Sequence, residues 1–181
     1  LHMLKKFFLI KAIGLFLYSC NHVPGEKSLK TDLIEKATDE VKLFINDQYD
    51  FFSIGSIDEA ERKFYKDAVL IGTDEKEYFF GWNKIKPSLL GQIDAIENPK
   101  FVTRNLNITM SDDGRMASYN QIIDFSYRTP TTESSSGVKY EIKNIRNSGV
   151  IKKISGDWKL IQIHWSIGVK GKVIEYELKN D

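Results

Sequence analysis

The stretch that most constrains the fold lies near the end of the chain, between Arg146 and Ser166. Two apolar runs that can alternate between an inside and an outside face flank the short polar segment Ser155-Gly156-Asp157. This segment contains the glycine that tight hairpin loops need for a positive φ angle. The pattern predicts a β-hairpin, and the hairpin implies a sheet around which the rest of the chain is organised.

The second arm of this hairpin is asymmetric, because side chains along a strand alternate between two faces. One face is mixed and holds Trp158, Leu160, Gln162, His164 and Ser166. The other is almost wholly apolar and holds Lys159, Ile161, Ile163, Trp165 and Ile167. We expect the mixed face to form the floor of a pocket, and the apolar face to be a packing or dimer surface.

Residues 1–19 have the layout of a secretory signal peptide, in which two lysines precede an apolar run over residues 7–17. The run is shorter than the roughly 20 apolar residues that a transmembrane helix needs. Its Leu-Tyr-Ser-Cys ending resembles a bacterial lipobox, which implies lipid attachment to Cys20 and export to the cell envelope. The alternatives are an ordinary signal, or a buried N-terminal helix in which the cysteine is incidental.

The remaining chain has the length of one domain. Residues 20–30 contain Pro24-Gly25 and few apolar residues, so they are expected to form a tether behind the lipidated cysteine. The domain is assigned to residues 31–170. Residues 171–181 form a tail, in which 173–178 either adds an edge strand or hangs free.

Helical patterns come first in this domain and strand patterns come after them. Helices are predicted from Thr31 or Asp32 to about Ile45, from Ser56 to about Phe64 or Lys66, and over 83–93. Strands are predicted over 68–74, 77–82, 101–110, 115–128 and 138–154, before the second arm of the hairpin. This order is typical of an α+β fold with helices on one face of the sheet.

Two groups of residues resemble a known family. The segments 67–74 (DAVLIGTD) and 80–85 (FGWNKI) are similar to a stretch of SnoaL-like domains, and Arg146, Gly149-Val150, 156–160 (GDWKL) and 163–166 (IHWS) resemble their closing hairpin. These domains belong to the NTF2-like superfamily. The resemblance covers about residues 31–168.

The resemblance implies an NTF2-like cone, in which a curved antiparallel β-sheet wraps around about three N-terminal helices and encloses a conical pocket. It also implies frequent dimerisation through the outer face of the sheet, and we expect a homodimer. It does not imply one reaction, because this superfamily includes isomerases, dehydratases, ligand-binding domains and assembly modules. Function must therefore be argued from the site.

Arg146 and His164 are the strongest site candidates, because both occupy family positions on neighbouring strands. If they share the concave face, Arg146 binds a carboxylate through its planar guanidinium, and His164 donates or accepts a proton. The competing interpretation is structural, with Arg146 in a salt bridge to Asp124 and His164 as a paired core residue. The further candidates for lining the pocket are Trp82, Tyr78, Gln162 and Asn120.

Three functional hypotheses arise from these residues. The first is a lipid-anchored domain that binds a small, partly apolar and acidic molecule in the cone. The second is an enzyme of the ketosteroid isomerase or dehydratase type with His164 or a carboxylate such as Asp124 as the base, although no complete catalytic set can be aligned. The third is an assembly module without catalysis.

Several classes of partner lack support in the sequence. Lys and Arg number 26 against 25 Asp and Glu, without a long basic block, so nucleic-acid binding is not expected. The three histidines and one cysteine do not have metal-ligand spacing, so no metal site is expected. Motifs for phosphate or dinucleotide binding are missing, and we expect no cofactor.

Overall fold

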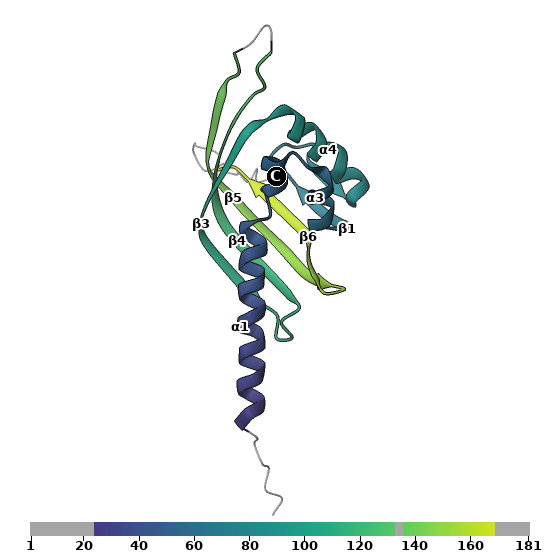
Figure 1. The fold of residues 1–181 in the computed structure, drawn as a ribbon, viewed down its shortest axis with the longest axis vertical. Helices are drawn as coiled ribbons and strands as arrows, with labels where there is room; N and C mark the ends of the chain where they lie inside the picture. Colours follow the sequence, from purple (N-terminus) through teal and green to yellow (C-terminus); the bar gives the residue numbers. More distant parts are fainter. Residues whose placement is uncertain (1–23, 133–135, 169–181) are drawn as a thin grey trace, which may run out of the picture.

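A computed structural model describes residues 24–132 and 136–168 (Figure 1). The helices are α1 (Pro24–Asn46), α2 (Asp50–Ile54), α3 (Ile57–Lys63) and α4 (Trp82–Ala95). The strands are β1 (Phe64–Ile71), β2 (Tyr78–Phe80), β3 (Glu97–Met110), β4 (Met116–Arg128), β5 (Lys139–Ile154) and β6 (Asp157–Ser166). The predicted α+β class is confirmed. The predicted signal peptide (1–19), Cys20 and the predicted tail (171–181) lie outside the described residues.

The strands form one sheet in the order β2-β1-β6-β5-β4-β3, which curves around the helices as Figure 1 shows. Neighbouring strands are antiparallel except β1 and β6, which run parallel. This parallel pair arises because the predicted closing hairpin, β5 and β6, inserts β6 beside the early strand β1. The sheet is therefore mixed rather than wholly antiparallel.

Three asparagines mark the points at which the long strands bend. Asn98 and Asn105 in β3 and Asn144 in β5 have φ angles of 50°, 55° and 60°, and each lies at a shift of strand register. Asparagine tolerates this left-handed region better than most residues, and the extra residue of a β-bulge bends and twists its strand. These bulges give the sheet the curvature that leaves room for a cavity on its inner face.

A further bulge in β6 corrects the predicted faces of the hairpin. Val150 pairs with Gln162 but Ile151 pairs with Leu160, so Ile161 is an extra residue in β6. Trp158 and Leu160 point inward before the bulge, whereas Ile163 and Trp165 point inward after it. A one-residue insertion exchanges the faces of all residues beyond it. The expectation that His164 faces the cone is therefore wrong.

The helices differ from the prediction mainly at their ends. Helix α1 begins at Pro24 rather than at Thr31 or Asp32, so part of the predicted tether is helical. Proline is well suited to the first helical position, where its missing N–H has no partner in any case. The predicted start at Ser56 is confirmed, because its hydroxyl accepts a hydrogen bond from the Glu59 backbone N–H at 3.3 Å. The short helix α2 was not predicted.

Helix α1 is held on the inner face of the sheet by apolar packing and by one charged group. Ala37, Val41 and Ile45 are buried in the core. The Glu40 carboxylate accepts hydrogen bonds from Lys153 Nζ at 2.5 Å and from Trp158 Nε1 at 3.1 Å. These bonds, the first above all, lower the pKa of Glu40. Within the described residues, none of the helices is long and apolar enough to cross a membrane.

Candidate functional site

The main candidate site is a cavity of about 630 Å³ between the inner face of the sheet and the helices, which we call the inner cavity. Its walls come from α2, from α4, from the link between α1 and α2, and from the sheet strands. A volume of this size is typical of small-molecule sites. The inner cavity is therefore large enough to hold a compact organic ligand.

One wall of the inner cavity is a continuous row of stacked rings, which we call the aromatic row. Its members are Tyr49, Phe101, Phe125, Tyr127 and Tyr140. Successive ring centroids are 4.6, 4.5, 5.0 and 5.3 Å apart, and the interplanar angles are between 11° and 23°. The row provides a broad apolar surface with the geometry of offset stacking.

The strand register explains how the sequence builds this row. Phe125 and Tyr127 are two residues apart on β4, so they point to the same face. Phe101 pairs with Phe125 across β3 and β4, and Tyr140 pairs with Tyr127 across β4 and β5. Tyr49 extends the row from the link between α1 and α2.

Two polar side chains at the inner cavity are buried with atoms left unpaired. Tyr119 donates its hydroxyl hydrogen to Gln48 Oε1 at 2.6 Å, but Gln48 Nε2 has no partner among the described residues. The Tyr49 hydroxyl is likewise buried and unpaired within the described chain. Such groups are costly in a folded protein unless something binds to them.

Burial keeps the two tyrosines of this region in the neutral form. Desolvation raises the pKa of Tyr49 well above its ordinary value, and the nearby Tyr119 adds to the shift. Burial also raises the pKa of Tyr119. The Tyr49 hydroxyl is thus available as a hydrogen-bond donor, and together with the Gln48 amide it suits an acceptor oxygen.

The inner cavity contains little charge. Tyrosines apart, Glu77 is the one acidic or basic residue among the described residues that line the cavity. The Glu77 carboxylate is already engaged, because it accepts hydrogen bonds from the backbone N–H groups of Thr73 and Asp74 at 2.9 and 3.1 Å. The cavity therefore favours an uncharged occupant.

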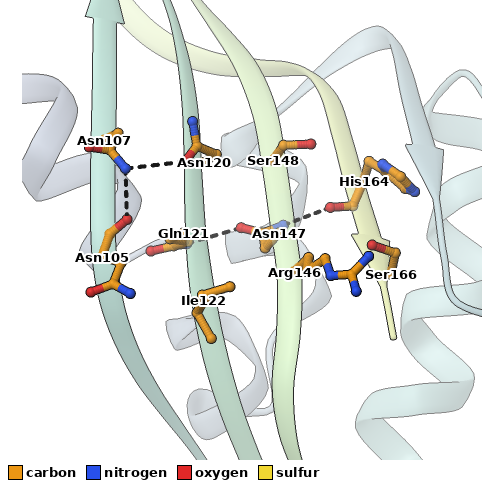
Figure 2. A pocket seen from close by; sticks show the side chains of 10 residues that line it. All are labelled: Asn105, Asn107, Asn120, Gln121, Ile122, Arg146, Asn147, Ser148, His164 and Ser166. Carbon is orange, nitrogen blue, oxygen red and sulfur yellow. Dashed lines mark hydrogen bonds between the residues drawn. The ribbon is translucent and has the colours of Figure 1, made fainter. Parts of the chain in front are cut away.

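A second, smaller pocket of about 310 Å³ lies on the opposite face of the sheet (Figure 2). All of its lining residues come from strands β3 to β6, and we call it the outer pocket. They are Asn105, Asn107, Asn120, Gln121, Ile122, Arg146, Asn147, Ser148, His164 and Ser166. Nine of these ten residues are polar or charged, whereas most residues that line the inner cavity are apolar.

The structure brings Arg146, His164 and Asn120 together, but in the outer pocket rather than in the cone. The bulge at Ile161 turns His164 to the outer face. The strand register places Arg146 opposite Ser166 on the same face. The suggested salt bridge between Arg146 and Asp124 is not formed. Asp124 instead accepts hydrogen bonds from the Asn144 backbone N–H and from Arg104, which lower its pKa.

The other sequence candidates lie apart from both cavities. Trp82 is buried at the start of α4 beside Phe64, in keeping with the core interpretation. Tyr78 lies exposed on the edge strand β2, and Gln162 is exposed on the outer face. These three side chains therefore line neither the inner cavity nor the outer pocket.

Sequence reasoning missed the aromatic row and Gln48. The spacing of Phe125 and Tyr127 was a usable signal, since it repeats every second residue along one predicted strand. Tyr49 and Gln48 had no such signal, because they lie in a link that was assigned to no element. Among the described residues, no group of three His, Cys, Asp or Glu side chains is arranged to hold a metal ion.

Comparisons with known proteins agree with this architecture. The model of the SnoaL-like domain family matches residues 41–170. No curated protein matches the chain. An NTF2-like superfamily protein from Salmonella enterica is 17% identical with a TM-score of 0.61, and the alignment covers 78% of this chain and 97% of that one.

Two similar solved structures carry the names of proposed enzymes. A proposed dehydratase of the NTF2-like family from Streptomyces avermitilis is 12% identical with a TM-score of 0.65, over 75% of this chain and 99% of that one. A proposed scytalone dehydratase from Novosphingobium aromaticivorans is 14% identical with a TM-score of 0.65, over 79% of this chain and 93% of that one. Identities this low establish a shared fold and no shared reaction.

Proposed function

The chain belongs to the SnoaL-like domain family, within the NTF2-like fold, and we propose that it binds a small, planar and largely apolar molecule in its inner cavity. The observation that carries this proposal is the aromatic row along the wall of a 630 Å³ cavity. The unpaired Gln48 amide and Tyr49 hydroxyl add a preference for a ligand with one acceptor oxygen, such as a ketone. Polar groups of this kind orient a ligand within an apolar site.

The sequence led us to expect an acidic ligand, but that expectation depended on Arg146 in the cone. Arg146 faces the outer pocket, and the described lining of the inner cavity includes no lysine, arginine or histidine. An anion in the cavity would lose its hydration without gaining a counter-charge. A neutral ligand is the better match.

Binding without proton transfer is the favoured activity. A general base must lie within hydrogen-bond reach of the proton that it removes. Both candidate bases, His164 and Asp124, are on the outer side of the sheet. The Glu77 carboxylate holds a turn, and the raised pKa of Tyr49 leaves little phenolate at neutral pH.

Tyr49→Phe tests the proposal with fluorenone and fluorene, which differ in one carbonyl oxygen. We expect fluorenone to bind wild type more tightly than fluorene, and Tyr49→Phe to weaken fluorenone binding about tenfold, a loss of about 1.4 kcal/mol. Fluorene binding should not change. Titration followed by intrinsic tryptophan fluorescence measures both, because Trp165 lines the cavity.

The stability of the ligand-free Tyr49→Phe variant provides an internal check. Removing a buried unpaired hydroxyl should leave the free energy of unfolding unchanged or raise it by about 1 kcal/mol. Tyr127→Phe is the matched control, since Tyr127 belongs to the same row but is less buried. The proposal fails if neither compound binds wild type, or if both Tyr→Phe variants alter fluorenone binding equally.

We also propose that the domain is held at a membrane of the bacterial cell envelope through lipid on Cys20. The support is the lipobox-like sequence alone, with its charged and apolar leader. Cys20→Ala in the full-length chain should move the protein from the membrane fraction to the soluble fraction, as followed by immunoblot. His22→Ala is the control, because it changes a residue near Cys20 but outside the Leu-Tyr-Ser-Cys motif, and it should leave the distribution unchanged. An unchanged distribution of Cys20→Ala would refute lipid anchoring.

A further inference from the structure

We propose that the outer pocket is a second binding site, which takes a small polyhydroxylated carboxylate such as a sugar acid. The pocket measures about 310 Å³ and shares no lining residue with the inner cavity. This volume is at the lower end of the range for ligand sites and suits a single sugar ring. Because the sheet separates the two spaces, this site is independent of the function proposed for the inner cavity.

The charge of the pocket comes from Arg146, which is exposed at one wall (Figure 2). Within the described chain, no carboxylate forms an ion pair with its guanidinium. Asp124, the acid that the sequence suggested, is held by Arg104 at 2.8 Å. Arg146 Nη2 lies 2.8 Å from where a Cβ on Gly168 would be, so a glycine there leaves room for the guanidinium. A planar guanidinium without a partner suits a carboxylate.

The opposite wall is made of amides that are fixed by one another. Asn107 Nδ2 donates to the Asn105 carbonyl oxygen at 3.1 Å and to Asn120 Oδ1 at 3.3 Å, as the dashed lines in Figure 2 show. This arrangement leaves Asn107 Oδ1 as an acceptor and Asn120 Nδ2 as a donor toward a ligand. Paired donors and acceptors of this kind recognise hydroxyl groups.

Half-buried hydroxyls complete the pocket between these walls. Ser148 and Ser166 lie on β5 and β6, and each can both donate and accept a hydrogen bond. Arg146 is the one permanently charged side chain among the described lining residues. One permanent cation with amide and hydroxyl groups around it fits a monoanion with several hydroxyls better than a phosphate dianion.

The test uses D-glucuronate as the probe, with glucose lacking the carboxylate and acetate lacking the ring and its hydroxyls. We expect glucuronate to cause saturable amide shifts in a ¹⁵N–¹H NMR titration, centred on the pocket residues of β3 to β6. Glucose and acetate should each bind at least tenfold more weakly. Arg146→Gln should weaken glucuronate binding at least tenfold, and Arg146→Lys should restore part of the loss because it keeps the charge without the planar fork.

Arg115→Gln is the control, because Arg115 is an exposed arginine outside the pocket. It should leave glucuronate binding unchanged. The proposal is overturned if glucuronate gives no saturable shifts up to about 10 mM, a limit that corresponds to negligible affinity. It is also overturned if Arg146→Gln binds as wild type does. Sedimentation that shows a wild-type dimer, a monomeric Arg146→Gln variant and no effect of sugar would assign the pocket to a dimer interface instead.

Discussion

Gly149→Ala is expected to lower the free energy of unfolding by about 3 kcal/mol, since it combines overpacking with a broken buried hydrogen bond. A Cβ at this position would lie 2.6 Å from Tyr119 Cε1, 2.7 Å from the Tyr119 hydroxyl and 2.8 Å from the Gln162 carbonyl oxygen. The backbone oxygen belongs to the neighbouring strand and cannot move without loss of pairing. The tyrosine ring must therefore shift.

That shift would reach the inner cavity. The Tyr119 hydroxyl bonds Gln48 Oε1 at 2.6 Å, and Gln48 Nε2 is already unpaired among the described residues. Losing the bond would leave the buried Gln48 side chain without the Tyr119 hydroxyl, and burying an unpaired polar group lowers the free energy of unfolding. Gly149→Ala should thus weaken fluorenone binding as well as stability.

Urea denaturation followed by far-UV circular dichroism measures the stability change. Gly91→Ala is the matched control, because a Cβ on Gly91 in α4 would meet no atom within 4 Å. Alanine is favoured over glycine in a helix by up to about 1 kcal/mol, so this variant should be neutral or more stable. If the two variants had equal stability, the close packing of Tyr119 over Gly149 would be wrong.

The positions of most elements can be predicted from periodicity, but the faces of the sheet cannot. The hairpin, the capped start at Ser56 and the long strands all have local signals, namely a turn glycine, a serine cap and runs of alternating residues. The bulge at Ile161 has none, because it depends on how β6 fits against β5 and β1 together. That one residue moved His164 from the predicted cone to the outer pocket.

The same bulge affects the predicted dimer surface. Ile163 and Trp165 were expected at an interface because they formed an apolar face, yet they point into the inner cavity. The outer face at this level is instead lined by His164, Ser166 and Ser148. A homodimer through the outer face stays a prediction, and these apolar side chains no longer support it.

Sequence similarity and sequence periodicity contributed different parts of the site. Arg146 and His164, which the family resemblance singled out, both line the outer pocket because they lie on the same face of the adjacent strands β5 and β6. The resemblance had no bearing on the aromatic row, whose rings come from β3, β4, β5 and the link before α2. Stacking across such distant segments depends on strand register, which bulges decide.

Phe101→Ala should lower the free energy of unfolding by about 3 kcal/mol and abolish fluorenone binding. Phe101 stacks between Tyr49 and Phe125, and its ring also approaches Phe52 and Trp165 at centroid distances of 5.7 and 6.3 Å. Truncating a phenylalanine in such a cluster removes apolar contact and leaves a void. We place the loss at the lower end of the usual range because Phe101 is half-buried.

Phe101→Leu separates packing from ring stacking. Leucine fills much of the same volume, so the loss of stability should stay below about 1.5 kcal/mol. Leucine also removes the stacking of Phe101 on Tyr49 and Phe125, which contributes about 0.5–1.5 kcal/mol beyond buried area and holds the wall of the cavity in shape. We therefore expect fluorenone and fluorene to bind Phe101→Leu three- to tenfold more weakly, and by the same factor. This differs from Tyr49→Phe, which should affect fluorenone alone.

The effects of Tyr49→Phe and Phe101→Leu on binding together decide whether the ligand lies against the aromatic row. Tryptophan fluorescence titrations of both compounds with both variants give the four affinity changes, and urea denaturation gives the stabilities. Phe80→Ala is the control for loss of a ring, since Phe80 is 63% exposed on β2 and lines neither cavity. Its effects on stability and binding should be small. Wild-type affinity of Phe101→Leu for both compounds would place their binding away from the row, because a ligand that lies against the row contacts the Phe101 ring.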